Sequence, residues 1–190
     1  MVADTEAEIL LRARSEREEL RRVACDQLVE VLSPRLSRLC LHLTGHAADA
    51  EDALQETLLA ICRNLPHFRG EARLSTWAYR IAIRAALEVK SRRTRRAEVS
   101  EELLKGHVAP GVPADEQASL RQRASRLAAA ADQLNPEQRA VLSLFAIDGL
   151  SHKEIAEVLG VPEGTVWSRL HLARKKVAAA MAKGNLSPEG

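Results

Sequence analysis

The residue types in this chain that could do chemistry are aromatic and cationic, and they are grouped. Trp77, Tyr79, Arg80 and Arg84 stand close together in a chain with only two Trp, one Tyr and two Phe. Aromatic rings beside cations suit single-stranded nucleic acid, because bases stack on the rings while phosphates meet the charges. Taken alone, Trp77 is more often a core residue. The cluster as a whole favours nucleic-acid binding.

A run of arginines follows in the same segment. Four of the five residues 92–96 are arginine: Arg92, Arg93, Arg95 and Arg96. Like charges at this density repel one another unless a polyanion lies beside them. We therefore expect this run to contact phosphate groups.

A second candidate site is a pair of short helices near the C-terminus. Ser151 and Glu154 have the spacing of a capping box at the start of a helix that Gly160 ends. After Pro162 a longer helix is expected. Two capped helices joined by a tight glycine turn are typical of a helix-turn-helix, whose second helix enters the major groove of DNA. A plain helical hairpin is the alternative.

The second of these helices has an apolar face for packing and a polar face for DNA. The N-terminal part of a recognition helix meets base edges, so Trp167, Ser168 and His171 are expected to read sequence. The rest of the predicted duplex-DNA site is Thr165, Arg169, Arg174, Lys175 and, on its flank, Lys176. The lysines and Arg174 are expected to hold phosphates.

The elements that must position these groups are helices. Aromatic residues make up only 3% of the chain, Ala, Leu, Glu and Arg are abundant, and no strand pattern occurs, which predicts an all-α fold. Pro34 is expected to end the first long helix, and the first dozen residues to fray. The predicted helices span about 16–32, 35–43, 49–65, 75–96, 136–149, 152–159 and 163–182.

Charge and turn residues divide the chain into two small helical domains, 1–96 and 119–190, joined by a flexible linker, 97–118. The linker contains Gly106, Pro110, Gly111 and Pro113 and has a net charge of −4, whereas each domain has +3. Two mildly basic bodies joined by an acidic tether suit contact with polyanions. Short acidic linkers are, however, common without such a role.

The cysteines and the N-terminus exclude other classes of protein. Cys25, Cys40 and Cys62 are odd in number and widely spaced, so we expect buried thiols rather than a disulfide framework. Cys40, His42, His46 and Cys62 match no standard zinc spacing, and neither a metal nor a cofactor is expected. No signal-peptide core and no apolar run near the roughly 20 residues of a membrane span occur, which predicts a cytoplasmic chain without membrane insertion.

Three segments, in order, resemble the extracytoplasmic-function (ECF) sigma factors of the sigma-70 family. DAEDALQETLLAICRNL resembles their polymerase-binding helix, FRGEARLSTWAYRIAIRAALEVKSRRTRR their segment for melting and reading the −10 element, and LNPEQRAVLSLFAIDGLSHKEIAEVLGVPEGTVWSRLHLARKKV their −35 reader. The resemblance covers roughly residues 25–96 and 130–180. It implies a protein that binds core RNA polymerase and directs promoter-specific initiation without being an enzyme.

The resemblance also implies roles for matching residues. One stripe of the 49–65 helix would dock on the polymerase clamp, although such a stripe is by default a solvated acidic face: Asp52, Gln55, Glu56 and Leu59. The loop 67–75 would receive an unstacked base of the non-template strand. The implied −10 site is His67, Phe68, Arg69, Trp77, Tyr79, Arg80, Arg84, Arg92 and Arg93, and the helix-turn-helix supplies the −35 site. Promoter DNA and an anti-sigma factor are the other implied partners.

Departures from the family pattern leave the promoter sequence open. Arg84 stands where the family usually has Asn, Trp167 where Lys or Arg is common, and Leu172 where Arg is common. Leu172 is instead suited to a thymine methyl group. The alternative function is an ordinary helix-turn-helix regulator, which would bind duplex DNA without polymerase.

Overall fold

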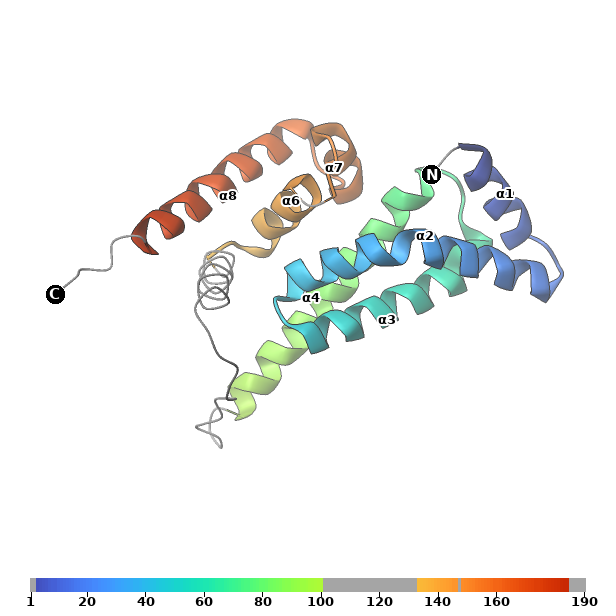
Figure 1. The fold of residues 1–190 in the computed structure, drawn as a ribbon, viewed down its shortest axis with the longest axis horizontal. Helices are drawn as coiled ribbons and strands as arrows, with labels where there is room; N and C mark the ends of the chain where they lie inside the picture. Colours follow the sequence, from blue (N-terminus) through green and yellow to red (C-terminus); the bar gives the residue numbers. More distant parts are fainter. Residues whose placement is uncertain (1–2, 101–132, 147, 185–190) are drawn as a thin grey trace, which may run out of the picture.

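The structure is a computed structural model that describes residues 3–100, 133–146 and 148–184, and all regular elements in this part of the chain are helical, as predicted (Figure 1). The helices are α1 (Ala3–Ala13), α2 (Glu18–Thr44), α3 (Ala47–Asn64), the 3-10 turn η1 (Leu65–His67), α4 (Leu74–Ser100), α6 (Pro136–Ala146), α7 (His152–Leu159) and α8 (Glu163–Gly184). None of them is long and apolar enough to cross a membrane. Most of the predicted linker lies outside the described residues.

Helices α1 to α4 form an N-terminal bundle. A leucine stripe on α2 lies in its centre: Leu28, Leu32, Leu36, Leu39 and Leu43, each at most 3% exposed. On α4 the facing positions are Ala78, Ala82 and Ala86, all fully buried. Because alanine is small, this face of α4 can pack closely against α2 and α3.

The predicted break at Pro34 is wrong, because α2 continues through it. Proline inside a helix removes one hydrogen bond and costs about 3 kcal/mol. Pro34 lies on the exposed side of α2, however, and the buried leucine stripe runs past it without a phase shift. Burial of each such leucine contributes about 1.5–3 kcal/mol, so packing of the whole stripe outweighs the lost bond.

The expected fraying of the first dozen residues is also wrong, because α1 is anchored by packing. Ile9 and Ala13 are each 1% exposed. A carboxylate oxygen of Glu6 accepts a hydrogen bond from the backbone N–H of Leu74, at the start of α4. Arg14, just after α1, donates to the carbonyl oxygen of Phe68 at 2.8 Å.

The C-terminal helices α6, α7 and α8 form the predicted helix-turn-helix. The Ser151 capping box is present, with the Glu154 N–H donating to the Ser151 hydroxyl and the Ser151 N–H to the Glu154 carboxylate. Asn135 and Gln138 cap the start of α6 in the same reciprocal way. Gly160 ends α7 with a φ of 64°, in the left-handed region that favours glycine.

The C-terminal helices pack on the N-terminal bundle. Helix α6 contacts α2 and α7 contacts α4, as the two groups of helices in Figure 1 show. Val141 and Leu144 of α6 and Ile155 and Val158 of α7 are buried in one hydrophobic cluster with the bundle leucines. This arrangement, which we call the closed form, determines which candidate site residues are accessible.

The interpretation of the cysteines is wrong for two of the three. Cys25 of α2 and Cys62 of α3 form a disulfide, with their Cα atoms 5.4 Å apart. The two residues are 37 positions apart, and only the antiparallel packing of α2 on α3 brings them together. Cys40 is the expected buried thiol, and burial raises its pKa to about 11. No group of three or more potential metal ligands occurs among the described residues.

Candidate nucleic-acid interface

The acidic stripe on α3 faces away from the bundle. Ala53, Thr57 and Ile61 are the buried side of this helix. Asp52, Gln55 and Leu59 are exposed on the other side, with Leu59 49% exposed. The stripe therefore combines carboxylates with one large apolar side chain, a composition suited to docking on a basic protein surface.

Two arginines of the α4 run form ion pairs with acidic residues of α3. Arg92 pairs with Glu56, and Arg93 pairs with Asp49 at 2.9 Å. Asp52 and Val89 complete a shallow pocket of about 260 Å³ between α3 and α4. The hydrogen bond that Arg92 donates to the Glu56 carboxylate raises the pKa of Arg92 above its ordinary value. The candidate polymerase and −10 surfaces are thus adjacent, which the 36- and 44-residue separations concealed.

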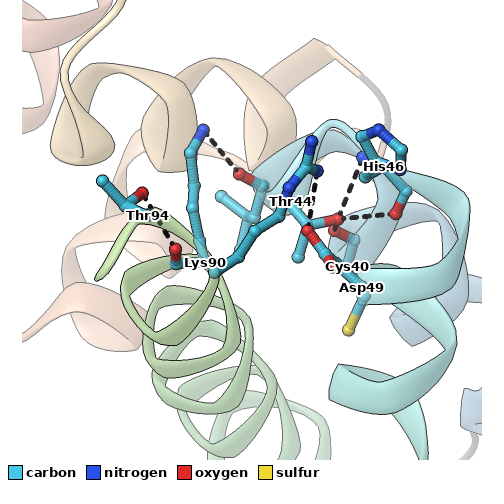
Figure 2. Close-up of polar contacts among 8 residues, drawn as sticks. Cys40, Thr44, His46, Asp49, Lys90 and Thr94 are labelled. Carbon is cyan, nitrogen blue, oxygen red and sulfur yellow. Dashed lines mark hydrogen bonds and ion pairs between the residues drawn. The ribbon is translucent and has the colours of Figure 1, made fainter. Parts of the chain in front are cut away.

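The turn between α2 and α3 aligns the acidic end of α3 with α4. Figure 2 shows the Thr44 hydroxyl donating to the carbonyl of Cys40 at 2.9 Å and to that of His46 at 3.2 Å. Lys90 of α4 donates to the carbonyl of Leu43 at 3.5 Å. These bonds satisfy carbonyls at the end of α2 and place Asp49 within reach of Arg93.

The predicted site residues before α4 differ in exposure. His67 and Arg69 are exposed, whereas Phe68 is only 8% exposed. The Phe68 ring packs 5.2 Å from the ring of Trp77, which is half-buried against the core. Trp77 therefore has the core contact expected for a lone tryptophan, with part of its surface still open.

In the closed form, Arg80 bonds to α7 while its side chain stays exposed, and Tyr79 is buried beside Asp148 of the segment between α6 and α7. Tyr79 is only 3% exposed. Arg80 donates through Nη2 to the carbonyl of Glu157 at 2.6 Å and through Nε to that of Val158 at 3.3 Å. These carbonyls lie at the C-terminal end of α7, where a helix has partial negative charge. Arg84 is exposed, one turn further along α4.

The recognition helix α8 presents an aromatic and apolar reading surface. Trp167 is 61% exposed, and its ring is stacked on that of His171, with centroids 5.7 Å apart and planes 3° from parallel. Leu172 is 48% exposed. The Ser168 hydroxyl donates to the carbonyl of Thr165 at 3.0 Å, which leaves its oxygen able to accept.

The cations of α8 differ in how they are held. Arg169 pairs with Glu137 at 2.7 Å, and Arg174 lies 4.6 Å over the Phe145 ring. Lys176 donates to the carbonyl of Gln133 and to the side chain of Gln138. Lys175 is exposed and has no such partner among the described residues. Only Lys175 of this group is therefore held ready for a phosphate without giving up an internal contact.

Comparison with known proteins finds two family models that match separate parts of the chain. Residues 28–96 match the model of sigma-70 region 2, and residues 124–177 match that of sigma-70 region 4. The RNA polymerase sigma-H factor of Pseudomonas aeruginosa is 33% identical over 166 residues, covering 83% of this chain and 86% of its own length. The ECF sigma factor SigM of Mycobacterium tuberculosis H37Rv is 36% identical over 157 residues, covering 83% and 76%.

This chain is an ECF sigma factor of the sigma-70 family. The ECF sigma factor SigE of Mycolicibacterium smegmatis is 37% identical over 83% of this chain, which spans only 62% of that protein's length. Among solved structures, CnrH in complex with the cytosolic domain of CnrY has a TM-score of 0.69 at 22% identity, over 95% of this chain and 99% of the other. The sigma factor RpoE of Bartonella quintana, in complex with the anti-sigma factor NepR, has a TM-score of 0.63 at 22% identity, over 86% and 98%. These two structures show the same fold.

The sequence did not predict the contacts that α4 and its N-terminal flank make with α7 and with the segment before α7. Besides Arg80, Arg73 of α4's N-terminal flank lies 3.6 Å from Glu154 of α7. Asp148 lies beside Tyr79, and both carboxylate oxygens of Asp148 and the Tyr79 hydroxyl are buried without a hydrogen-bond partner among the described residues. Burial raises the pKa of Asp148 despite opposing effects of Tyr79, Arg38 and Arg35. Burial and the Asp148 charge raise that of Tyr79 to about 12.

Replacing Asp148 by Asn should stabilise the sigma factor at pH 7. A carboxyl with a raised pKa in the folded state binds protons more tightly there than in the unfolded chain. Its ionisation therefore lowers stability as pH rises above its ordinary value of 3.8. We expect a higher urea midpoint for Asp148→Asn at pH 7, and a difference that shrinks as pH falls toward 4. Glu30→Gln, on the exposed face of α2, is the control. A lower midpoint at pH 7 would show that the charge stabilises the closed form.

Proposed function

We propose that this sigma factor binds core RNA polymerase, directs it to particular promoters in the cytoplasm and performs no catalytic step itself. The observation that carries this proposal is the presence in one chain of an exposed acidic stripe on α3 and a helix-turn-helix with an outward-facing reading surface. An ordinary helix-turn-helix regulator has no use for the first of these. We assign residues 1–96 to polymerase binding and −10 recognition, 97–118 to the linker and 119–190 to −35 recognition.

Docking on polymerase would use Asp52, Gln55, Glu56 and Leu59. Exposed carboxylates steer association with a basic surface and set its orientation, whereas a buried apolar contact slows dissociation. Leu59, half exposed between the polar residues, is suited to the second role. Glu56 would exchange its pairing with Arg92 for a cation of the polymerase, which would release Arg92 toward DNA.

Promoter opening would use the −10 residues of α4 and the preceding loop. Trp77 and Tyr79 offer rings for stacking, while Arg80, Arg84 and Arg93 offer charges for the strand backbone. In the closed form Tyr79 is buried and Arg80 is bonded to the end of α7. Before either can bind DNA, Tyr79 has to be uncovered and the Arg80 guanidinium released from α7. We therefore propose that the two domains separate before the −10 strand binds.

Recognition of the −35 element would use the outward face of α8. His171 and Ser168 have polar atoms for base edges, and Trp167 and Leu172 have apolar surface for thymine methyl groups. Thr165 lies at the start of this face, and Lys175 would hold the phosphate backbone. Arg169 and Arg174 are committed to Glu137 and Phe145, so we assign them mainly to positioning the helix.

An anti-sigma factor is a further proposed partner. The structures of CnrH and of RpoE from Bartonella quintana were obtained in complex with the cytosolic domain of CnrY and with the anti-sigma factor NepR, respectively. This chain has the same fold, and its closed form buries Tyr79 and bonds Arg80 to α7. A partner that binds both domains at once would hold that form and delay promoter binding.

Charge reversal on α3 tests the polymerase assignment. We expect Asp52→Arg with Glu56→Arg to abolish promoter-specific transcription by purified core polymerase and to weaken core binding at least tenfold, because two attractive contacts become repulsive. Glu30→Arg, an exposed carboxylate on α2, is the matched control and should retain activity. Unchanged binding by a folded double variant would overturn the docking assignment. Duplex binding by the free wild-type protein at moderate salt would favour the regulator.

Two substitutions on α8 separate sequence reading from phosphate binding. Lys175→Ala should weaken −35 duplex binding about three- to tenfold on every sequence and reduce the magnitude of its salt slope by about 1. His171→Ala should instead change the order of preference among sequences and leave the salt slope unchanged. Binding of a randomised −35 library by polymerase holoenzyme measures both. The same uniform loss in both variants would show that His171 reads no base.

A further inference from the structure

The disulfide between α2 and α3 is the feature that the proposed function does not use. Cys25 lies in the N-terminal half of α2 and Cys62 in the last turn of α3. Their Cα separation of 5.4 Å is in the range from which a disulfide forms without backbone movement. The pair therefore needs no rearrangement of the bundle to be made or broken.

The third cysteine provides an internal contrast. Cys25 and Cys62 are both partly exposed, whereas Cys40 has no exposed surface. Burial raises the pKa of Cys40 to about 11, so its reactive thiolate is scarce at neutral pH. An oxidant or reductant dissolved in water reaches the Cys25–Cys62 pair and not Cys40.

We propose that Cys25 and Cys62 form a reversible thiol–disulfide pair that makes the stability of the N-terminal bundle depend on redox conditions. With a peroxide as oxidant, one thiolate attacks a peroxide oxygen, giving a sulfenic acid and one water. The second thiol displaces the hydroxyl as a second water and forms the disulfide, so two thiols lose two hydrogens and two electrons to one hydrogen peroxide. A dithiol reverses the bond by exchange. Disulfides in a reducing compartment are mostly redox-sensing or catalytic, which favours a regulatory role here.

The position of the pair links its redox state to the polymerase-docking helix. Cys62 follows Leu59 by three residues, about one helical turn, so the disulfide joins the end of the docking stripe to α2. A cross-link over 37 residues restricts the unfolded chain more than the folded one. The oxidised bundle should therefore keep α3 in place to a higher temperature than the reduced bundle.

The test compares full-length protein treated with hydrogen peroxide and with dithiothreitol. We expect the oxidised form to be lighter by two hydrogens, to contain a Cys25–Cys62 cross-linked peptide, and to melt about 10 °C higher. Cys25→Ser and Cys62→Ser should each lose this difference, and Cys40→Ala should keep it, although its core is less stable. At a temperature between the two melting points, only the oxidised wild type should bind core polymerase.

The outcomes separate this inference from the function proposed above. Absence of the cross-linked peptide after peroxide, or equal melting of oxidised and reduced wild type, would overturn the redox role. Both readouts use the wild-type chain, so a variant that fails to fold does not obscure them. Failure of every form to bind polymerase at low temperature would count against the docking assignment, while the mass and melting results would still decide the thiol chemistry.

Discussion

A helix of eight residues ends with carbonyl groups that its own N–H groups cannot satisfy, and this constraint operates at α7. Gly160 closes the helix with one bond to the carbonyl of Ala156. The carbonyls of Glu157 and Val158 instead accept from Arg80, a residue of α4 77 or 78 positions earlier. An arginine suited to a phosphate strand therefore caps the first helix of the helix-turn-helix. If Arg80 binds the −10 strand, as proposed, it has to leave these carbonyls. The end of α7 and the promoter strand therefore compete for the Arg80 guanidinium.

The closed form is held by a mixture of strong and poor contacts. Apolar residues of α6 and α7 join the bundle core, which favours packing. The carboxylate oxygens of Asp148 and the hydroxyl of Tyr79 are buried there, and burial disfavours the charged carboxylate. The Arg73–Glu154 pair is largely exposed, and exposed ion pairs contribute little. An interface of this kind is suited to opening when a partner offers better contacts for the same groups.

The sequence predicted the features that local chemistry determines. The Ser151–Glu154 capping box and the glycine that ends α7 were predicted correctly because each depends on residues within one or two turns. The resemblance identified the family. Features that depend on contacts between distant segments were not predicted. These are the continuation of α2 through Pro34, the disulfide between Cys25 and Cys62, and the ion pairs of Arg92 and Arg93 with α3. Each depends on which helices pack together, and a single helix does not encode that.

The same limit applies to the candidate sites. The stripe on α3 and the outward face of α8 were predicted from helical periodicity and are exposed as expected. Phe68 was chosen by resemblance to a DNA-binding segment and Tyr79 as part of the aromatic and cationic cluster, and both are buried in the closed form. Phe68 packs on Trp77, and Tyr79 lies beside Asp148 of the segment between α6 and α7 and beside Arg35 of α2, long-range contacts that the α4 sequence does not reveal.

The central claim is that α7 binds the −10 residue Arg80 in the free protein and leaves it in the polymerase complex. The most direct test is the distance between spin labels at Glu88→Cys on α4 and Lys153→Cys on α7, both exposed positions, in protein with the Cys25–Cys62 disulfide intact. The closed form predicts one short, narrow distance distribution in the free protein and a longer distance after core polymerase binds. A short distance in both states, or a long one already in the free protein, would contradict it.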